Sequence, residues 1–490
     1  MVPATDHFKV LSRRLNQRLS RPPWLRLGLV LAWISFVLLG VMVVAFCFSY
    51  IFLPVDYYLP MSLWELLMAV AGLRLLSVGL ASLHDRLGQQ LQASPERAAG
   101  HFRWALRMTP GNPEIYLHWG QLLRARGDMG QARELYLRAR DILPGDDQPY
   151  VQLAALALGQ GDWREASRLF DLAYRLRRGV AWNELPERIP EEAPLPPQNR
   201  AISTTVTKLN HDAQQLEFLL GGKYLPAHFR SLQQAYHDLL RETLGQGQGP
   251  EIRLSKRQQA RIQLFYGRNV FISPVPSFPR EVVNPELEAR KLEQTYLNAD
   301  PALVVIDDLL LPDTVEALLH FCEKSTIWHD DSRPGGYLGA YMDDGFSCDL
   351  LYQIAHELRD ALPGIFNGLP LKHMWAYKYD SRREGIGIHA DRAAINVNFW
   401  ITPDAANLDP AHGGLLVYPA KAPEDWSFAD INVDTEKALS FVAAREPIRI
   451  PYRQNRAVVF NSRLFHATDT ISFKDDYLMR RINITMLFGL

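Results

Sequence analysis

Two histidines and one aspartate near the end of the chain have the residue types of a metal site. His389 and Asp391 are separated by one residue, and His466 follows much later, just after an apolar stretch. A His-x-Asp pattern alone means little, since the chain has a second one at His329 and Asp331. A metal centre with two histidines and one carboxylate also needs a distant histidine, and it leaves one face open for substrate and oxygen. His466 supplies that histidine for the later pair.

Further polar side chains are predicted close to this site by the alternation of two strands. Residues on the same face of a strand lie two positions apart. In each of two predicted strands, three residues lie on one face of the strand. They are Asn396, Asn398 and Trp400 in the first strand, and Arg481, Asn483 and Thr485 in the second. A polar face suits a pocket, and a planar guanidinium can hold a carboxylate through two hydrogen bonds. Packing is an equal alternative for Asn396, Asn398 and Trp400, and a surface charge is the alternative for Arg481.

The elements that must position these residues define an α+β domain that begins near residue 300. The apolar run Leu303–Asp307 predicts a buried strand, and 311–321 predicts a capped helix. Further strands are predicted at 373–379, 395–402, 414–418, 456–460 and 481–488. This dense set of short strands is typical of a sandwich or barrel.

The region 302–490 resembles the iron(II)- and 2-oxoglutarate-dependent dioxygenases, in their prolyl-hydroxylase-like branch. Beyond the two histidines and the aspartate, the resemblance is carried by Tyr379, ten residues before the first histidine, by the Gly-Gly-x-Leu pattern Gly413 to Leu416, and by Arg481 with Thr485 four residues later. One feature differs from the family. The interval between the second metal histidine and Arg481 is longer than is usual in the prolyl hydroxylases.

This resemblance implies a double-stranded β-helix, or jelly roll, with flanking helices. It implies that His389, Asp391 and His466 hold Fe(II) and form the catalytic centre. It also implies that Arg481, Tyr379 and Thr485 bind 2-oxoglutarate as a cosubstrate, with O2 as the oxidant and ascorbate as an optional addition. The implied reaction is oxidative, with decarboxylation of 2-oxoglutarate to succinate, and the protein supplies the geometry for cofactor chemistry.

A period of 34 residues upstream of this region predicts a helical repeat over 94–178. Tyr116 recurs as Tyr150 and Ala132 recurs as Ala166, each 34 positions later. The pattern resembles the tetratricopeptide repeat, a helix-turn-helix unit whose arrays often present a concave protein-binding face. We therefore expect either a docking surface for a protein partner or a spacer.

Two segments connect the repeat to the predicted oxygenase domain. Residues 182–200 contain several prolines and acidic residues, which is typical of a linker. Residues 201–298 carry helical patterns but no recognisable chemistry, so they are predicted to be a helical connector of unknown role.

The chain begins with a basic arm, residues 1–26, followed by a long apolar run. Residues 27–53 contain no Asp, Glu, Lys or Arg. Because a helix of that length exceeds the roughly 30 Å of a bilayer core, we expect a transmembrane span there. A second apolar run, 61–83, carries Glu65 and Arg74. It is predicted to be the second span of a membrane anchor, with an amphipathic surface helix as the alternative.

The basic residues on both sides of this anchor favour a hairpin with both ends in the cytoplasm. We therefore expect the chain in the inner (cytoplasmic) membrane, with the lipid bilayer as a partner and the catalytic domain in the cytoplasm. The net charge of −1, from 53 basic and 54 acidic residues, gives no indication of a nucleic-acid partner. Three cysteines are too few for a disulfide framework.

The sequence thus predicts a multidomain chain and leaves three functions open. The leading hypothesis is a membrane-anchored dioxygenase that hydroxylates a side chain of a protein or peptide docked by the repeat. The second keeps this chemistry but acts on a lipid or small metabolite. The third is a catalytically inactive membrane-bound scaffold. The complete metal triad together with Tyr379 and Arg481 argues against the scaffold.

Overall fold

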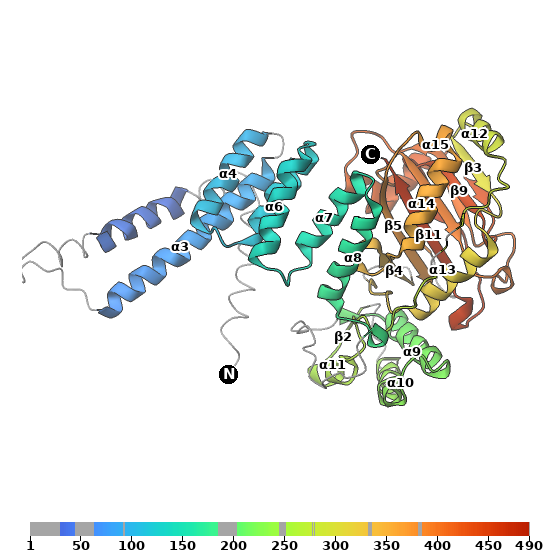
Figure 1. Ribbon diagram of the computed structural model, residues 1–490, viewed down its shortest axis with the longest axis horizontal. Helices are drawn as coiled ribbons and strands as arrows, with labels where there is room; N and C mark the ends of the chain where they lie inside the picture. The colour runs from blue at the N-terminus through green and yellow to red at the C-terminus, as the bar shows by residue number, and fades with distance from the viewer. Residues whose placement is uncertain are drawn as a thin grey trace, which may run out of the picture. The chain divides into compact units, whose positions relative to one another are not determined.

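A computed structural model gives the structure of the chain (Figure 1). It describes residues 30–44, 63–91, 94–184, 203–244, 251–276, 278, 280–331, 336–380 and 385–489. The predicted basic arm 1–26 and most of the predicted linker, 185–200, lie outside the described residues. The chain divides into two compact units, Met1–Gln152 and Leu153–Leu490.

The described part of the first unit is helical. Residues 30–44 form a helix, and they are followed by α3 (Leu63–Gln90), α4 (Pro95–Met108), α5 (Pro113–Ala125), α6 (Met129–Ile142) and the start of α7 (Gln148–Gly159). Helix α5 packs closely on α6 because Gly120 has no side chain: a Cβ there would lie 2.4 Å from the Tyr136 ring. Tyr116 and Tyr150, one period apart, each donate from the hydroxyl to a proline carbonyl six residues upstream.

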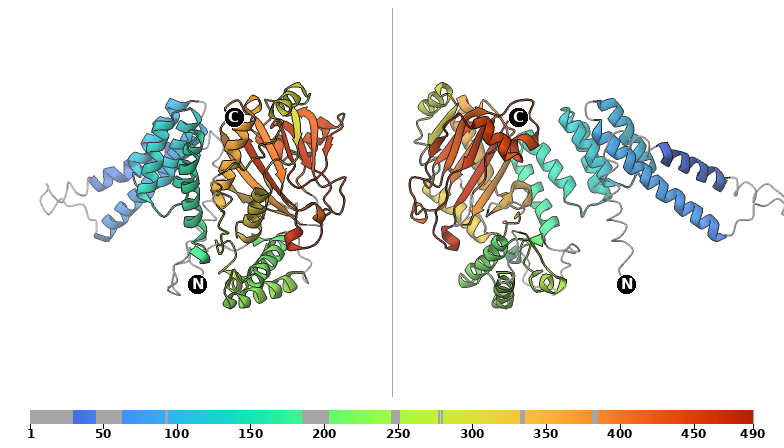
Figure 2. Two further views of the ribbon diagram at one scale, coloured as in Figure 1. Left: turned by 45° about the vertical axis from the view of Figure 1, so that its right-hand side comes forward. Right: turned by 180° about the vertical axis from the view of Figure 1, so that it is seen from behind.

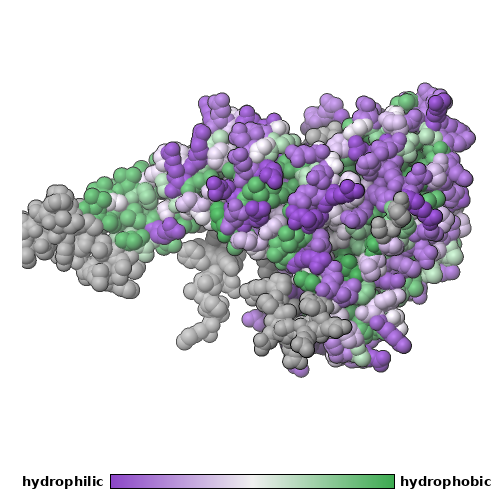
Figure 3. All heavy atoms as spheres, in the orientation of Figure 1, coloured by the Kyte–Doolittle hydropathy of each residue, from purple (hydrophilic) through white to green (hydrophobic). Residues whose placement is uncertain are grey.

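The predicted membrane anchor is wrong for the part of the chain that the structure describes. None of the helices in this part is both long and apolar enough to cross a membrane. The first apolar run is described as a helix only over 30–44, and the second run continues within α3 into the polar residues His84 and Asp85. Both helices do expose apolar side chains such as Leu38 and Leu75, and Figure 3 shows the hydrophobic surface there. The transmembrane prediction and the predicted location in a membrane are therefore withdrawn.

Helix α8 (Trp163–Arg178), the last helix of the predicted repeat, is built into the second unit. It packs on α14 (Asp349–Ala361) and on the short helix η4 (Met342–Asp344). The Tyr174 hydroxyl donates to the Thr326 carbonyl over 2.9 Å. Arg178 donates to both carboxylate oxygens of Asp344, over 2.9 and 2.5 Å. This end of the repeat is thus a structural part of the sheet-containing unit.

The predicted connector also folds against this unit. It consists of β1 (Ser203–Thr204), α9 (Val206–Gly221), η3 (Ala227–Phe229), α10 (Arg230–Leu244), β2 (Ile252–Arg253), α11 (Lys256–Ile262) and α12 (Ala289–Asn298). Lys208 and Asp212, both buried on α9, form an ion pair. One turn further along α9, Gln215 donates to the Ser325 carbonyl over 2.9 Å. Polar contacts therefore fasten the connector to the residues that follow α13 (Pro312–Lys324).

Two antiparallel sheets form the centre of the second unit. The larger one has six strands in the order β3-β9-β6-β11-β5-β4, and the smaller one has three in the order β10-β7-β8. The strands are β3 (Leu303–Ile306), β4 (Tyr337–Tyr341), β5 (Leu371–Tyr379), β6 (Ile395–Trp400), β7 (Leu415–Lys421), β8 (Ile448–Ile450), β9 (Ala457–Asn461), β10 (Leu464–Thr468) and β11 (Ile482–Phe488). Helices α13 and α14 cover one face of the larger sheet (Figures 1 and 2). The remaining helices of this region are α15 (Pro363–Phe366), α16 (Phe428–Asn432) and α17 (Thr435–Val442).

These sheets correct the predicted fold class in a second way. The prediction was a double-stranded β-helix, whereas the described residues form an open six-stranded sheet with a smaller three-stranded one and with helices preceding it. The difference arises at the sheet edges, because β3 extends the sheet beyond β9 and β4 extends it beyond β5. The predicted fold class is therefore wrong as stated, and the open six-stranded sheet with its smaller neighbour replaces it.

The strand register decides which side chains share a face of the larger sheet. Thr485 in β11 lies opposite Asn398 in β6 and opposite Trp375 in β5. Asn483 lies opposite Trp400 and Tyr377 in the same way. Because side chains alternate along a strand, these residues lie on one face, and the apolar residues Ile482, Ile484 and Met486 lie on the other. We call the first face the inner face, because it carries the candidate site described below.

The Arg178–Asp344 pair predicts a pH dependence of stability. Burial opposes ionisation of Asp344, but hydrogen bonds from Arg178 outweigh it and lower the pKa of this carboxyl to about 2. A carboxylate with a pKa lowered by folding stabilises the fold above its unfolded value of 3.8, and that contribution is lost as the pH falls toward 2. We expect about 2 kcal/mol of unfolding free energy to be lost in this window, measured by urea denaturation. Asp344→Asn should lack this loss, and an equally steep pH dependence in that variant would contradict the assignment.

Candidate metal centre

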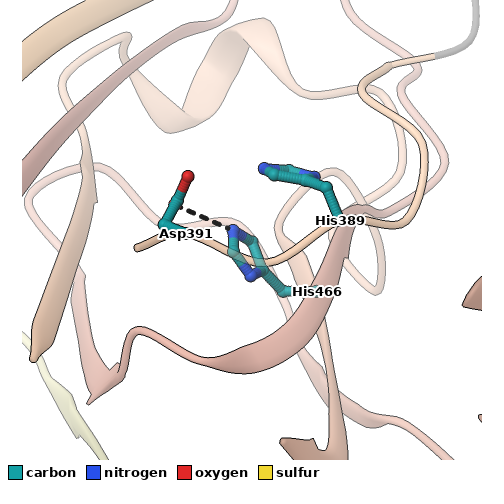
Figure 4. Close-up of side chains that lie close together, drawn as sticks. All are labelled: His389, Asp391 and His466. Atoms are coloured by element: carbon teal, nitrogen blue, oxygen red, sulfur yellow. Dashed lines mark ion pairs between the residues drawn. The ribbon is translucent and has the colours of Figure 1, made fainter. Parts of the chain in front are cut away.

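The backbone brings the two predicted metal histidines side by side. His389 and His466 exchange two backbone hydrogen bonds, of 2.9 and 2.8 Å, in an isolated antiparallel bridge. Their rings lie 4.2 Å apart between centroids. The Asp391 backbone N–H donates to the Ser462 carbonyl over 3.0 Å, which holds the aspartate beside the pair. Figure 4 shows the three side chains converging on one point.

Hydrogen bonds orient both imidazoles for metal binding. The Nδ1 of His389 lies 2.9 Å from the Gly387 carbonyl, and the Nδ1 of His466 lies 2.9 Å from the Leu464 carbonyl. Since a carbonyl can only accept, each Nδ1 carries the proton, and Nε2 is left as the ligand atom. Burial and the neighbouring His389 lower the pKa of His466 well below its usual range, which keeps this imidazole neutral.

The geometry and chemistry of this group fit a divalent metal ion. Ligand atoms of His389, Asp391 and His466 all lie within 4.8 Å of one another. The distance from His466 Nε2 to Asp391 Oδ2 is 3.6 Å. Two neutral imidazoles and one carboxylate, without a thiolate, are a donor set that suits Fe(II). The structure therefore brings together the three residues that were predicted as ligands, in a group that could hold a metal.

Arg481 is buried with an incomplete set of hydrogen-bond partners. Its Nε donates to the Gly413 carbonyl over 2.6 Å, and its Nη2 donates to the Gly414 carbonyl over 3.1 Å. Its Nη1 has no hydrogen-bond partner among the described residues, although the side chain is fully buried. A buried guanidinium with an unpaired N–H is suited to binding an acidic ligand.

Aromatic rings surround this guanidinium. Its Cζ lies 4.6 Å from the ring centroid of Tyr379, 5.6 Å from that of Trp400 and 6.0 Å from that of Tyr452. Burial raises the pKa of Tyr379, so its hydroxyl stays protonated and lies 3.3 Å from the Thr468 hydroxyl. The structure thus places the Tyr379 ring next to the Arg481 guanidinium.

The glycine pair in the Gly-Gly-x-Leu pattern has a steric role here. Gly413 adopts a φ of +83°, which favours glycine. A Cβ on Gly414 would lie 1.9 Å from the Ile450 carbonyl oxygen, so the position just before β7 has no room for a side chain. Both glycine carbonyls accept from Arg481, and the close packing therefore helps to hold the guanidinium.

The remaining predicted pocket residues fall into two groups. Trp400 is buried beside Arg481, and its Nε1 has no hydrogen-bond partner among the described residues. Asn396, Asn398, Asn483 and Thr485 form one hydrogen-bonded cluster next to Asp391. The Thr485 hydroxyl donates to Asn398 over 2.9 Å, and it is thus engaged within the protein at the position where the resemblance implied a contact with 2-oxoglutarate.

The alternation of 373–379 predicts Trp375, Tyr377 and Tyr379 on one face of a strand, but sequence reasoning missed the β4 part of this aromatic wall on the inner face. Tyr337 and Tyr341 from β4 continue the row that Trp375, Tyr377 and Tyr379 begin in β5. The Tyr-x-Gly-x-Tyr alternation of 337–341 is a strand signal that could have revealed β4. These side chains form a largely buried aromatic cluster on the same face of the sheet as Asn483 and Thr485.

The other His-x-Asp pair has a packing role. Nε2 of the partly buried His329 lies 3.0 Å from the Tyr174 hydroxyl. Asp331 accepts from the hydroxyls of Thr204 and Thr205 over 3.3 and 3.4 Å. Within the described residues, only the group at His389 has the ligand spacing of a metal site.

Comparisons with known proteins give structural neighbours of low similarity. No family model and no curated protein matches the chain. The non-heme α-ketoglutarate-dependent carbocyclase SnoK from nogalamycin biosynthesis has a TM-score of 0.34 and 13% identity, over 43% of this chain and 87% of that chain. The corresponding epimerase SnoN has a TM-score of 0.33 and 12% identity, over 41% of this chain and 82% of that chain.

A third solved structure, MamA, has a TM-score of 0.19 and 19% identity, over 23% of this chain and 67% of that chain. Two of the three neighbours are thus non-heme enzymes that depend on α-ketoglutarate, which is another name for 2-oxoglutarate. At TM-scores this low, the likeness carries no conclusion about this chain. The site itself defines the class, a protein with a candidate mononuclear metal centre of two histidines and one carboxylate.

Metal addition gives a direct test of the centre. We expect Co(II), or Fe(II) without oxygen, to raise the thermal unfolding midpoint, because a ligand that binds only the folded state stabilises it, by about 3 kcal/mol at ~100 times its Kd. Asp391→Ala should lose most of this rise in differential scanning fluorimetry. Asp331→Ala is the matched control from the second His-x-Asp pair and should keep it. An equal rise in Asp391→Ala would show that the metal binds elsewhere.

Proposed function

We propose that this protein is an Fe(II)- and 2-oxoglutarate-dependent oxygenase that hydroxylates its substrate. The observation that carries the proposal is the buried Arg481 guanidinium, with an unpaired Nη1, on the same side of the sheet as the His389, Asp391 and His466 group. When bound there, Fe(II) would supply the redox chemistry by which O2 oxidises 2-oxoglutarate to succinate and CO2 and converts a substrate C–H to C–OH. Succinate and the hydroxylated substrate each take one oxygen atom from O2.

The protein's own residues would bind and orient the cosubstrate. Arg481 Nη1 would donate to the distal carboxylate of 2-oxoglutarate, and Tyr379, whose ring centroid lies 4.6 Å from the guanidinium Cζ, would share the contact. The rings of Tyr379, Trp400 and Tyr452 exclude water from around the guanidinium. A charge-assisted hydrogen bond is stronger in such a dry environment than at the surface.

We propose a side chain of a protein or peptide as the substrate. The helical repeat supports this proposal, because paired helices of this kind commonly form protein-binding faces. A small metabolite is the second candidate, because the aromatic side chains of Tyr337, Trp375 and Tyr377 lie on the inner face, and small-molecule sites are lined mainly by apolar and aromatic side chains. A lipid substrate, or a scaffold without activity, has no comparable support in the described residues. Ascorbate is proposed only as an assay component.

The function is tested by assaying succinate. Purified protein with Fe(II), 2-oxoglutarate and O2 should form succinate, and addition of substrate should increase the rate. Asp391→Ala should abolish this activity because the carboxylate ligand is lost. Absence of succinate from wild-type protein with every candidate substrate would refute the proposal.

Two neighbouring arginines provide a sharper test of the cosubstrate site. Arg481→Lys should raise the KM for 2-oxoglutarate by about 10–100-fold, because a lysine cannot donate in the same planar geometry and a charge-assisted hydrogen bond contributes about 1.5–3 kcal/mol. Arg480→Lys is the matched control, since Arg480 Nη2 donates to Gln214 of α9 over 2.8 Å. It should change this KM much less than Arg481→Lys does, because Arg480 supports the segment and makes no contact with the proposed cosubstrate. Equal KM effects in the two variants, measured by initial succinate rates, would contradict the assignment.

A further inference from the structure

A continuous chain of side-chain hydrogen bonds connects the candidate metal carboxylate to β11. Asn396 Nδ2 donates to Asp391 Oδ2 over 2.7 Å. Asn398 Nδ2 donates to Asn396 Oδ1 over 2.5 Å. Asn398 Oδ1 in turn accepts from Asn483 Nδ2 and from the Thr485 hydroxyl, each over 2.9 Å. We call Asn396, Asn398, Asn483 and Thr485 the amide relay.

The strand register explains how this relay forms. Asn396 and Asn398 are two residues apart in β6, so their side chains emerge on the same inner face. Thr485 lies directly opposite Asn398, and Asn483 is two residues before it in β11. Asn396, Asn398, Asn483 and Thr485 are all buried, with at most 5% of the residue exposed. A buried polar group costs free energy unless it is hydrogen-bonded, so this cluster calls for an explanation beyond packing.

The relay has only one consistent direction. The Thr485 hydroxyl accepts from Asn483 Nδ2 over 3.1 Å, so its single proton is directed to Asn398 Oδ1. With its oxygen engaged there, Asn398 must turn its amino group to Asn396. Asn396 must then turn its own amino group to Asp391 Oδ2. The Asp391 carboxylate can only accept, so it fixes this direction: reversing the amides together would place the Asn396 oxygen against the carboxylate.

We propose that Asn396 is a positioning residue for the Asp391 carboxylate and that the relay fixes its orientation. This inference rests on the proposed function only in taking Asp391 as a metal ligand. The same oxygen that accepts from Asn396 lies 3.6 Å from His466 Nε2, on the side where the ligand atoms converge. The amide thus holds the carboxylate against rotation away from the histidines. Hydrogen-bonding partners of metal ligands typically contribute about 10–100-fold to metal affinity or activity.

Metal affinity of a graded set of variants tests the relay. Asn396→Ala should weaken Co(II) binding by about 10–100-fold in a chelator competition, and it should shift the visible absorption bands of the Co(II) protein, because the carboxylate loses its fixed orientation. Asn398→Leu, which removes the partner that orients Asn396, should have a smaller effect. Thr485→Val should have the smallest, since Asn483 still donates to Asn398.

Asn269→Ala is the matched control for losing a buried asparagine. Asn269 is 4% exposed, and its amide donates to the Gly179 carbonyl. This variant should keep wild-type Co(II) affinity and spectrum. If Asn396→Ala keeps both as well, the inference is overturned. If Asn396→Ala does not fold, Asn398→Leu and Thr485→Val decide: a graded loss supports the relay, and wild-type affinity in both overturns it.

The outcomes separate this inference from the proposed function. Wild-type protein that binds Co(II) but forms no succinate from 2-oxoglutarate with Fe(II) would refute the oxygenase, while a graded loss across the variants would still support the relay. Succinate formation by wild-type protein together with unchanged metal binding in Asn396→Ala would refute the relay alone. Wild-type protein without Co(II) binding would overturn both.

Discussion

The candidate site depends on the antiparallel bridge between His389 and His466. Their two backbone hydrogen bonds, of 2.9 and 2.8 Å, fix the separation of the imidazoles before any side-chain contact is considered. His466 is also held on its other side, where it pairs with Val417 of β7. The register of β10 shifts between Leu464 and His466, and an irregularity of this kind re-aims the side chain that follows it. The loop that carries Asp391 and the strand that carries His466 are thereby joined into one rigid support.

Much of the site could be predicted from the sequence because it depends on residue type and strand alternation. Arg481 was chosen over Arg480 because side chains alternate between the two faces of a strand. In the structure the two arginines have different partners: Arg481 donates to glycine carbonyls, and Arg480 donates to Gln214. The strand β4 and the Tyr174 and Arg178 contacts were not predicted. They depend on pairs of residues far apart in the chain, such as Arg178 and Asp344, which no local pattern reveals.

The membrane prediction failed because hydropathy of a local run ignores tertiary partners. Helix α3 begins within the apolar run, but its later residues make polar contacts with other helices of the first unit. Asp85 accepts from His118 of α5 over 2.9 Å, and His84 Nδ1 lies 2.9 Å from His101 Nδ1 of α4. Burial and the neighbouring His101 lower the pKa of His84 to about 4. The polar end of α3 therefore packs on neighbouring helices. The hydropathy of residues 61–83 alone does not include these contacts.

The connector of unknown role gains a physical explanation from the alternation of residues at the start of β11. Arg480 donates to Gln214 of α9, whereas Arg481 donates to the carbonyls of Gly413 and Gly414. The backbone carbonyl of Arg480 also accepts from the Thr402 hydroxyl over 2.8 Å. The segment that presents the candidate cosubstrate arginine is therefore anchored on its opposite side by the connector. A helical segment without chemistry of its own can in this way set the precision of the site, because a buried guanidinium binds a carboxylate well only when its donors are held in place.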